Sequence, residues 1–156
     1  MQIVKSKHFW RFPVYLFYIS LLFGSFYFDL FFLLGCLLVM FGMFLYFRSR
    51  KELQSNYSSY PTIFKKHKLV KTGPYKHIRH PSYAGSFISM LGLLLISKSI
   101  VSLVYCLVVC IPFGFYKINL EEKLLRKKFG KEFKKYKQTT PMIIPKITSL
   151  LKLRQI

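Results

Sequence analysis

Four uncharged apolar runs alternate with polar breaks along the chain, and this pattern predicts an all-α, integral membrane protein. The runs cover residues 12–28, 30–47, 81–96 and 100–116. At about 1.5 Å per residue, the first two are just long enough to cross a hydrocarbon core of about 30 Å. The third is about 24 Å long, which implies local thinning of the bilayer or burial against neighbouring helices.

The breaks between the runs predict that the four transmembrane helices form two hairpins. Asp29 is the only charge between the first two runs. A hairpin places this acid at the lipid–water interface, whereas one continuous helix would bury it at mid-length. Residues 97–99 form the second turn. Pro81 suits the first turn of a helix, where its missing N–H is not needed, and Pro112 is expected to kink the fourth helix.

The segment 117–136 is expected to form a further, amphipathic helix on the cytoplasmic surface. Its lysines and arginines lie mostly away from the apolar stripe, so anionic lipid headgroups would favour them. Gly130 is a candidate for a bend. The stripe consists of Leu120, Leu124, Phe129, Phe133 and Tyr136.

The distribution of charge indicates the topology. The chain carries 25 Lys and Arg residues and a formal net charge of +20. A cytoplasmic location for both termini and for the 48–82 loop leaves only Lys98 on the other side, as the positive-inside rule requires. A chain that is 53% hydrophobic is also unusually apolar for a soluble nucleic-acid binder. We therefore expect one membrane domain, residues 1–156, with the lipid bilayer and no nucleic acid as partner.

Neither metal binding nor disulfides are expected. The three cysteines lie inside apolar runs, and no cluster of His, Cys and Asp has the spacing of metal ligands. The N-terminus does not resemble a signal peptide, because no small-residue cleavage site follows the first apolar run. Trp10 is placed as an interfacial anchor.

The polar segment 67–85 concentrates the candidate chemistry. It contains three of the four histidines, two of the seven prolines and two tyrosines. On residue type alone, His80 and Pro81 could simply begin a helix. Glu122 is interpreted as a surface acid paired with Arg126 or Lys117. Glu121 is interpreted as functional. The chain has only five acidic residues, and Glu121 is expected to lie near the membrane face of the segment 67–85.

These residues form an ordered pattern that resembles the isoprenylcysteine carboxyl methyltransferase family of membrane enzymes, which use S-adenosylmethionine. The resemblance covers residues 60–146 and leaves the first hairpin unmatched except as membrane span. The matching residues are Gly73-Pro74-Tyr75, Arg79-His80-Pro81-Ser82-Tyr83, Gly85, Glu121-Glu122, Phe129-Gly130 and Tyr136.

The resemblance implies a binding site for S-adenosyl-L-methionine. A helix that begins at Pro81 offers N–H groups to the cofactor's carboxylate, and a glutamate accepts hydrogen bonds from ribose hydroxyls. The resemblance assigns binding of the methyl acceptor to Lys117 and Arg79. Lys117 stands where the family has a substrate-binding arginine, and a lysine cannot form the paired, planar hydrogen bonds that a guanidinium forms with a carboxylate. By resemblance the cofactor-binding residues are His67, Lys68, Leu69, Val70, Tyr75, His80, Pro81, Ser82, Tyr83 and Glu121.

The leading functional hypothesis is carboxyl O-methylation of an isoprenylcysteine-like or other lipid-like acceptor. A carboxylate is ionised at pH 7 and needs no general base, so no catalytic residue is assigned beyond alignment of donor and acceptor. The alternatives are a phospholipid N-methyltransferase, an NADPH-dependent membrane sterol or steroid reductase, and a non-catalytic four-span anchor. The shortness of the chain suggests a multi-pass protein of a prokaryotic inner membrane.

Overall fold

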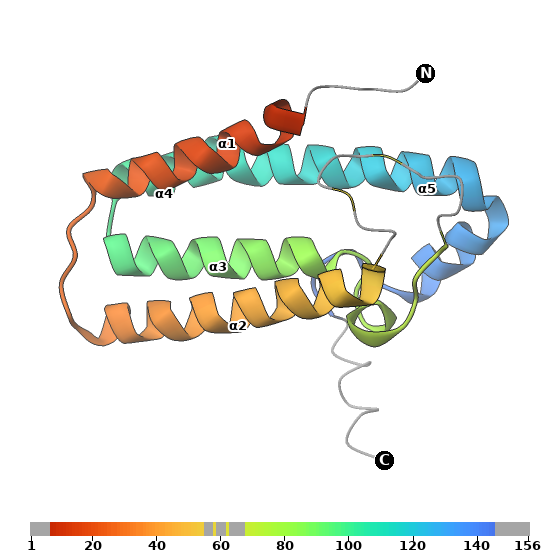
Figure 1. Cartoon of the computed structure of the whole chain (residues 1–156), viewed down its shortest axis with the longest axis horizontal. Coiled ribbons are helices and arrows are strands. Elements are labelled where there is room, and N and C mark those ends of the chain that lie inside the picture. Colours follow the sequence, from red (N-terminus) through yellow and green to blue (C-terminus); the bar gives the residue numbers. More distant parts are fainter. Residues whose placement is uncertain (1–6, 55–57, 59–61, 63–67, 146–156) are drawn as a thin grey trace, which may run out of the picture.

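The computed structural model describes residues 7–54, 58, 62 and 68–145, and they form helices and turns without a strand. Four long helical segments run nearly parallel to one another (Figure 1). The fourth consists of α4, η4 and the part of α5 that precedes Gly130. The elements in order are α1 (Lys7–Ser20), η1 (Leu21–Phe23), α2 (Leu30–Leu53), η3 (Gly73–Lys76), α3 (Pro81–Ser97), α4 (Ile100–Tyr105), η4 (Cys106–Cys110) and α5 (Ile111–Thr139).

Both hairpin turns lie at one end of the bundle, on the left of Figure 1. Asp29 caps α2 by accepting a hydrogen bond of 3.0 Å from the N–H of Phe32. Its other carboxylate oxygen lies 2.6 Å from Nζ of Lys98, and the N–H of Ser25 donates to the carbonyl of Ser97 at 2.8 Å. The turn expected at Asp29 is therefore confirmed, although the first helical segment ends at Phe23, before the predicted boundary at residue 28.

Helices α2 and α3 pack backbone against backbone through two glycines on each helix. A Cβ atom on Gly42 would lie 2.5 Å from the carbonyl oxygen of Gly85, and one on Gly92 would lie 2.6 Å from that of Gly35. The seven-residue spacing within each pair keeps both glycines on one helix face. This close contact holds the start of α3 against α2, which positions the polar loop between them.

The fourth helix differs from the expectation in two ways. A π-helical turn at Cys106–Cys110, in which the N–H of Ile111 donates to the carbonyl of Cys106, stands directly before Pro112 where a kink was expected. The helix then continues through residue 117 without a break. Residues 115–129 contain several good helix formers (Lys, Leu, Glu and Arg) and no Pro or Gly. The change of direction comes at Gly130, with φ 49° and ψ −115°. The expected separate tail helix is therefore the continuation of the fourth apolar helix.

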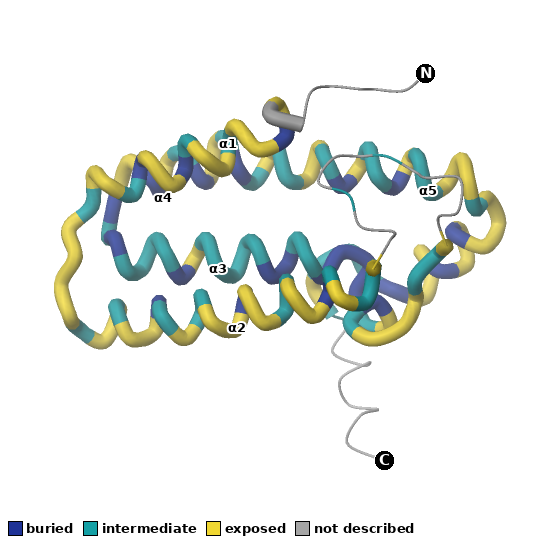
Figure 2. The backbone as a smooth tube through the Cα atoms, viewed as in Figure 1, coloured by how far each residue is buried: buried dark blue, intermediate teal, exposed yellow. Residues whose placement is uncertain are grey.

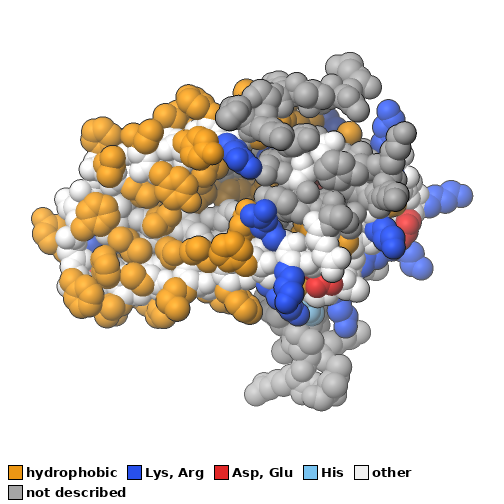
Figure 3. Space-filling model, in the orientation of Figure 1, with side chains coloured by type: hydrophobic (Ala, Val, Ile, Leu, Met, Phe, Trp, Pro, Cys, Tyr) orange, Lys and Arg blue, Asp and Glu red, His pale blue; other side chains and the backbone are white. Residues whose placement is uncertain are grey.

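The outer surface near the two turns is apolar and exposed, with Phe28 81% and Leu22 77% accessible (Figure 2). In the face drawn in Figure 3, hydrophobic side chains cover this half and Lys and Arg gather on the other. Residues 30–53 and 100–139 form helices long and apolar enough to cross a membrane, and the other two apolar helices are shorter. An exposed apolar surface of this size is typical of a lipid-facing helix bundle.

Candidate functional site

The segment 72–76, which precedes α3, is held by contacts to α2 and α5. Thr72 donates a hydrogen bond from its hydroxyl to Glu52 in the last turn of α2. Gly73 follows with φ 54°, a conformation that favours glycine. Tyr75, in η3, is buried, and its carbonyl accepts a 2.6 Å hydrogen bond from the hydroxyl of Tyr136. These contacts hold residues 72–75 between the ends of α2 and α5.

Arg79 forms a buried cluster between this loop and α5. Its Nε and Nη2 lie 2.9 and 2.8 Å from Oε1 of Glu122. Its Nη1 donates to the carbonyls of Lys137, at 3.2 Å, and Thr140. The guanidinium therefore uses its donors on the protein itself, which does not fit the acceptor-binding role that the resemblance implied for Arg79.

The chain beyond α5 folds back onto the same residues. The N–H of Arg79 donates to the carbonyl of Pro141 at 2.8 Å, and the N–H of His80 donates to that of Met142 at 3.0 Å. The kink at Gly130 turns the end of α5 back toward this segment (Figure 1). Main-chain hydrogen bonds to residues 141–142 thus hold the start of α3.

Glu122 is buried, so its interpretation as a surface acid paired with Lys117 or Arg126 is wrong. Burial alone would raise the pKa of this carboxyl, but its hydrogen bonds with His80, Lys137 and Arg79 lower the pKa to about 2. Glu122 is therefore an ionised carboxylate at neutral pH. Both Arg79 and Glu122 belong to the matched motif. Sequence reasoning did not pair them with each other.

His80, Tyr83 and Glu121 converge beside this cluster. The hydroxyl of Tyr83 donates to Oε1 of Glu121, and Nδ1 of His80 lies 3.9 Å from Oε2 of Glu121. Burial raises the pKa of Glu121, against the opposing effects of His80 and Tyr83. Nζ of Lys117 lies 5.5 Å from the centre of the Tyr83 ring. The start of α3 and the acid beyond the fourth apolar run therefore form one polar site.

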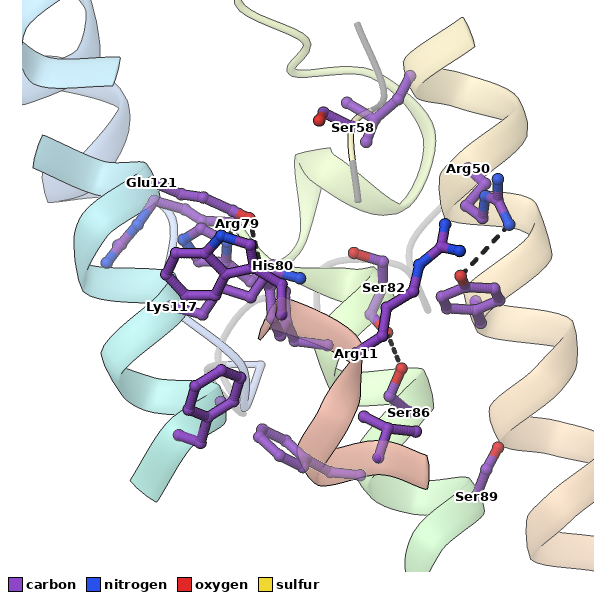
Figure 4. A pocket seen from close by; sticks show the side chains of 18 of the residues that line it. Arg11, Arg50, Ser58, Arg79, His80, Ser82, Ser86, Ser89, Lys117 and Glu121 are labelled. Atoms are coloured by element: carbon purple, nitrogen blue, oxygen red, sulfur yellow. Dashed lines mark hydrogen bonds and ion pairs between the residues drawn. The ribbon is translucent and has the colours of Figure 1, made fainter. Parts of the chain in front are cut away.

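This polar site opens into a cavity of about 730 Å³. Its other arm is apolar and lies between α1 and α2 over the face of α3, where Figure 3 shows a hollow. In Figure 4, His80, Lys117 and Glu121 lie on the side of α5, while Arg11 and Arg50 lie on the opposite side. A volume of this size is within the range of small-molecule sites.

Most residues assigned from the sequence line this one cavity. Pro81 begins α3 and is not among its lining residues, and His67 lies outside the described residues. The sequence reasoning missed the contribution of the first hairpin, which has no counterpart in the matched motifs. The assigned residues that line the cavity are Lys68, Leu69, Val70, Tyr75, Arg79, His80, Ser82, Tyr83, Lys117 and Glu121.

Trp10 provides a second, unanticipated feature of the cavity. Expected as an interfacial anchor, it is instead 2% exposed and lies against Phe113 and Tyr116 of α5. Its indole Nε1 is buried and has no hydrogen-bond partner in the described part of the chain. A buried donor without a partner destabilises a fold by about 1–3 kcal/mol. A ligand that brings an oxygen or nitrogen acceptor into the cavity would offset this.

The polar end of the cavity offers hydrogen-bond donors, an acceptor and an aromatic face to a ligand. The N-cap of α3 has no side-chain hydrogen bond, which leaves the first N–H groups of the helix to a ligand carboxylate. Tyr83 supplies an aromatic face and Glu121 an acceptor for hydroxyl groups. No group of three metal ligands occurs among the residues for which coordinates are described.

Comparison with known proteins agrees with the motif resemblance. The family model described as phospholipid methyltransferase matches residues 30–132. Protein-S-isoprenylcysteine O-methyltransferase of Saccharomyces cerevisiae is 36% identical over 114 residues, which are 72% of this chain and 48% of the relative. The enzyme of the same name from Schizosaccharomyces pombe is 34% identical over 106 residues, 65% of this chain and 45% of the relative.

The fold has a counterpart among solved structures. The eukaryotic intramembrane Ras methyltransferase, isoprenylcysteine carboxyl methyltransferase, superposes with a TM-score of 0.71 over 93% of this chain and 55% of that chain, at 22% identity. The family model and the two sequence relatives confirm the resemblance, and the solved structure shows the same fold. The chain spans about half the length of these relatives, and because they are eukaryotic, they give no support to the expected prokaryotic inner membrane.

Proposed function

This chain belongs to the phospholipid methyltransferase family, and on that premise we propose that it is an S-adenosylmethionine-dependent methyltransferase of the membrane. Its substrate is the carboxylate of an isoprenylcysteine-like or other lipid-like acceptor. The observation that carries the proposal is the single cavity that joins the polar site at Glu121 to an apolar arm between α1 and α2. A water-soluble donor and a lipid acceptor can meet in such a cavity.

The cofactor belongs at the polar end. Its carboxylate would accept from the first N–H groups of α3, and Glu121 would accept from hydroxyl or amino groups. S-Adenosylmethionine supplies an electrophilic methyl group on a positively charged sulfur. Tyr83 and Glu121 favour that positive charge in a site shielded from water. Residues 68–70 also line the cavity.

Arg79 and Glu122 are positioning residues in this proposal. Oε1 of Glu122 lies 3.3 Å from Nε2 of His80, so the ion pair orients the imidazole toward Glu121. Both side chains are buried and paired with each other, so we assign them to positioning and not to binding of the acceptor. Lys117, whose Nζ lies 5.5 Å from the centre of the Tyr83 ring, remains the cation assigned to the acceptor.

The charges in the cavity favour O-methylation over N-methylation. The acids of its described lining amount to Glu121, which is engaged by Tyr83. An amine acceptor must lose a proton and would need a base, whereas a carboxylate needs none. Phospholipid N-methylation remains the second candidate, supported by the description of the family model. The reductase alternative has no counterpart among the relatives above.

In the membrane we propose four spans with both termini and the loop 48–82 on the cytoplasmic side. The end with residues 24–29 and Lys98 then faces the opposite side, where Asp29 neutralises Lys98. The polar part of α5 follows the fourth span into the headgroup region. Its exposed lysines and arginines there favour anionic lipids.

The function can be tested with the purified chain in detergent and methyl-labelled S-adenosylmethionine. We expect saturable binding of the cofactor and transfer of label to N-acetyl-S-farnesylcysteine, in a product that releases labelled methanol in base. Glu121→Gln should abolish most of the transfer. Glu132→Gln, which changes an exposed acid outside the cavity lining, is the matched control. Base-stable label in phosphatidylethanolamine would instead assign N-methylation.

A further inference from the structure

We infer that the indole N–H of Trp10 donates a hydrogen bond to the carboxylate of the lipid acceptor, at the oxygen that does not attack the methyl group. This inference rests on the proposed function, because it names a residue that orients the methyl acceptor. Trp10 lines the cavity, and its Nε1 is buried without a hydrogen-bond partner in the described part of the chain. Buried polar atoms are normally paired, so a ligand of this cavity is the partner that the N–H lacks.

Three aromatic rings hold the indole in one orientation. Phe9 meets it edge-on with 5.4 Å between the ring centres, and Phe113 lies tilted at 5.6 Å. Tyr116 stacks on it at 6.2 Å, with 17° between the ring planes. These contacts satisfy the apolar part of the side chain and leave its N–H unpaired. A donor that packing already holds in place loses little side-chain freedom when it binds a ligand.

The contacts of Trp10 with α5 place it between the polar and the apolar arm of the cavity. Phe113 and Tyr116 precede Glu121 by eight and five residues, which corresponds to about 8–12 Å along a helix. Lys117 follows Tyr116 directly and lines the same cavity. The methyl donor is assigned to the end at Glu121, and the hydrocarbon chain of the acceptor to the apolar arm. The head group of the acceptor therefore lies at the level of Trp10 and Lys117.

The chemistry of the indole selects the ligand group. An indole N–H only donates, so its partner has to carry an available lone pair. The positively charged sulfur and the methyl group of S-adenosylmethionine are poor hydrogen-bond acceptors, and its carboxylate is assigned to the first N–H groups of α3. A protonated amine has no lone pair to offer. The carboxylate of the acceptor has lone pairs on both oxygens, and it can use one for Trp10 while the other faces the methyl group.

This hydrogen bond persists through the proposed reaction. The free carboxylate oxygen forms a bond to the methyl carbon as the carbon–sulfur bond breaks, and the electron pair of that bond stays on sulfur. No proton is gained or lost. The oxygen bonded to Trp10 becomes the carbonyl oxygen of the ester and still accepts from the N–H. Trp10 therefore orients the acceptor as a positioning residue, while Lys117 supplies the positive charge.

Trp10 is a feature of this chain outside the matched motifs, because the family model begins at residue 30. It is also the single tryptophan of the chain, so an isostere can replace it at that position alone. Benzothiophene keeps the shape of the indole and has sulfur in place of the N–H. Trp10→Phe is the second variant, which removes the N–H and part of the ring.

The test measures binding of two ligands to the full chain in detergent, with S-adenosylhomocysteine present to prevent turnover. Farnesylthiopropionic acid carries a carboxylate as its sole oxygen-bearing group, and methyl farnesyl thioether has no oxygen. The isostere at position 10 should bind the acid roughly tenfold more weakly than the wild type and the thioether equally well. With S-adenosylmethionine, the KM for the acid should rise by a similar factor. Trp10→Phe should show the same selective loss for the acid.

Stability of the unliganded protein should change in the opposite direction. The isostere removes a buried donor that has no partner, so its melting temperature should be at least as high as that of the wild type. A residue with a purely structural role would not combine this result with weaker binding of the acid. Tyr116→Phe is the control, because it keeps the ring that stacks on Trp10 and lies outside the cavity lining. It should match the wild type in stability and in binding.

The possible results separate this inference from the proposed function. Unchanged affinity and KM for the acid in the isostere would overturn the role of Trp10, while methyl transfer by both proteins would still support the function. An equal loss for the acid and the thioether would assign the effect to ring shape and would also overturn it. So would a lower melting temperature of the unliganded isostere, since the N–H would then be bonded within the protein. A selective loss for the acid, without methyl transfer by the wild type, would keep the donor site and refute the function.

Discussion

The two ends of the helical bundle each contain an ion pair between distant parts of the chain, and the pairs differ in burial. Asp29 and Lys98 lie 2.6 Å apart with side chains 40% and 29% exposed. Arg79 and Glu122 lie 2.8 Å apart with side chains 6% and 7% exposed. The exposed pair closes two turns in a region open to solvent. The buried pair carries further hydrogen bonds and holds the start of α3 against α5.

The difference shows how burial turns the same chemistry into a different structural role. Exposed ion pairs contribute little, because water and salt screen them. A buried pair is very sensitive to the loss of one partner, since the other charge is then left unpaired in a poorly solvated environment. We therefore expect substitutions at the two ends to have very unequal effects.

Glu122→Gln should have the largest effect on stability. It removes the charge that compensates buried Arg79, which typically destabilises a fold by about 3–5 kcal/mol. Thermal or denaturant unfolding of the purified protein in detergent would measure the change. Glu132→Gln, at an exposed ion pair with Lys71, is the control and should leave the free energy of unfolding nearly unchanged. Equal effects of the two variants would contradict the assigned role of burial.

Acid should weaken the fold through the same group. The pKa of Glu122 is lowered from 4.5 to about 2 in the folded chain. The contribution of ionised Glu122 to the free energy of unfolding is therefore complete above about pH 4.5, and it is lost as the pH falls toward 2. The shift corresponds to about 3 kcal/mol. Unfolding measured between pH 6 and 2 should show the wild type converging with Glu122→Gln. A constant difference across this range would exclude Glu122 as the source.

Glu121→Gln should separate binding from stability. Burial raises the pKa of Glu121, so its ionised form is disfavoured in the fold and stability increases as the pH falls through that pKa. A neutral amide should leave the free energy of unfolding unchanged or slightly higher at pH 7. The affinity for S-adenosylmethionine should fall roughly tenfold through loss of a charged acceptor. Isothermal titration and unfolding of the same preparation would check both.

Asp29→Asn should have the smallest effect. Asparagine caps helices about as well as aspartate, so the hydrogen bond to the N–H of Phe32 is kept. The lost ion pair with Lys98 is exposed and screened. The melting temperature and cofactor affinity should stay at wild-type values within error. A loss of stability as large as that of Glu122→Gln would remove the contrast between the two ends.

Each of the five acids joins parts of the chain that are far apart in the sequence. In a chain of net charge +20, every carboxylate has many possible cations, and sequence spacing does not select among them. This explains why Glu122 was wrongly paired with neighbours one turn away. The contacts are Asp29 with Lys98, Glu52 with Thr72, Glu121 with Tyr83, Glu122 with Arg79, and Glu132 with Lys71.

Local patterns predicted the helices well. The charge of Asp29 located the first turn, and Pro81 located the start of α3, because both act through the backbone of their own segment. The fourth helix was predicted to end at residue 116, which is too early. The change there from apolar to charged residues alters the surroundings of the helix, but it does not interrupt the helical backbone. The helix turns instead at Gly130, whose positive φ favours glycine.

The sequence by itself determined which segments are apolar helices, where the second, third and fourth of them begin, and which motif carries the chemistry, because these depend on neighbours along the chain. Only the tertiary structure decided that Glu122 is buried beside Arg79, that Trp10 lines the cavity, and that Arg11 and Arg50 lie across it from Glu121. The physical reason is distance. Burial and charge pairing depend on side chains that folding brings together from different helices, and no single stretch of sequence contains both partners.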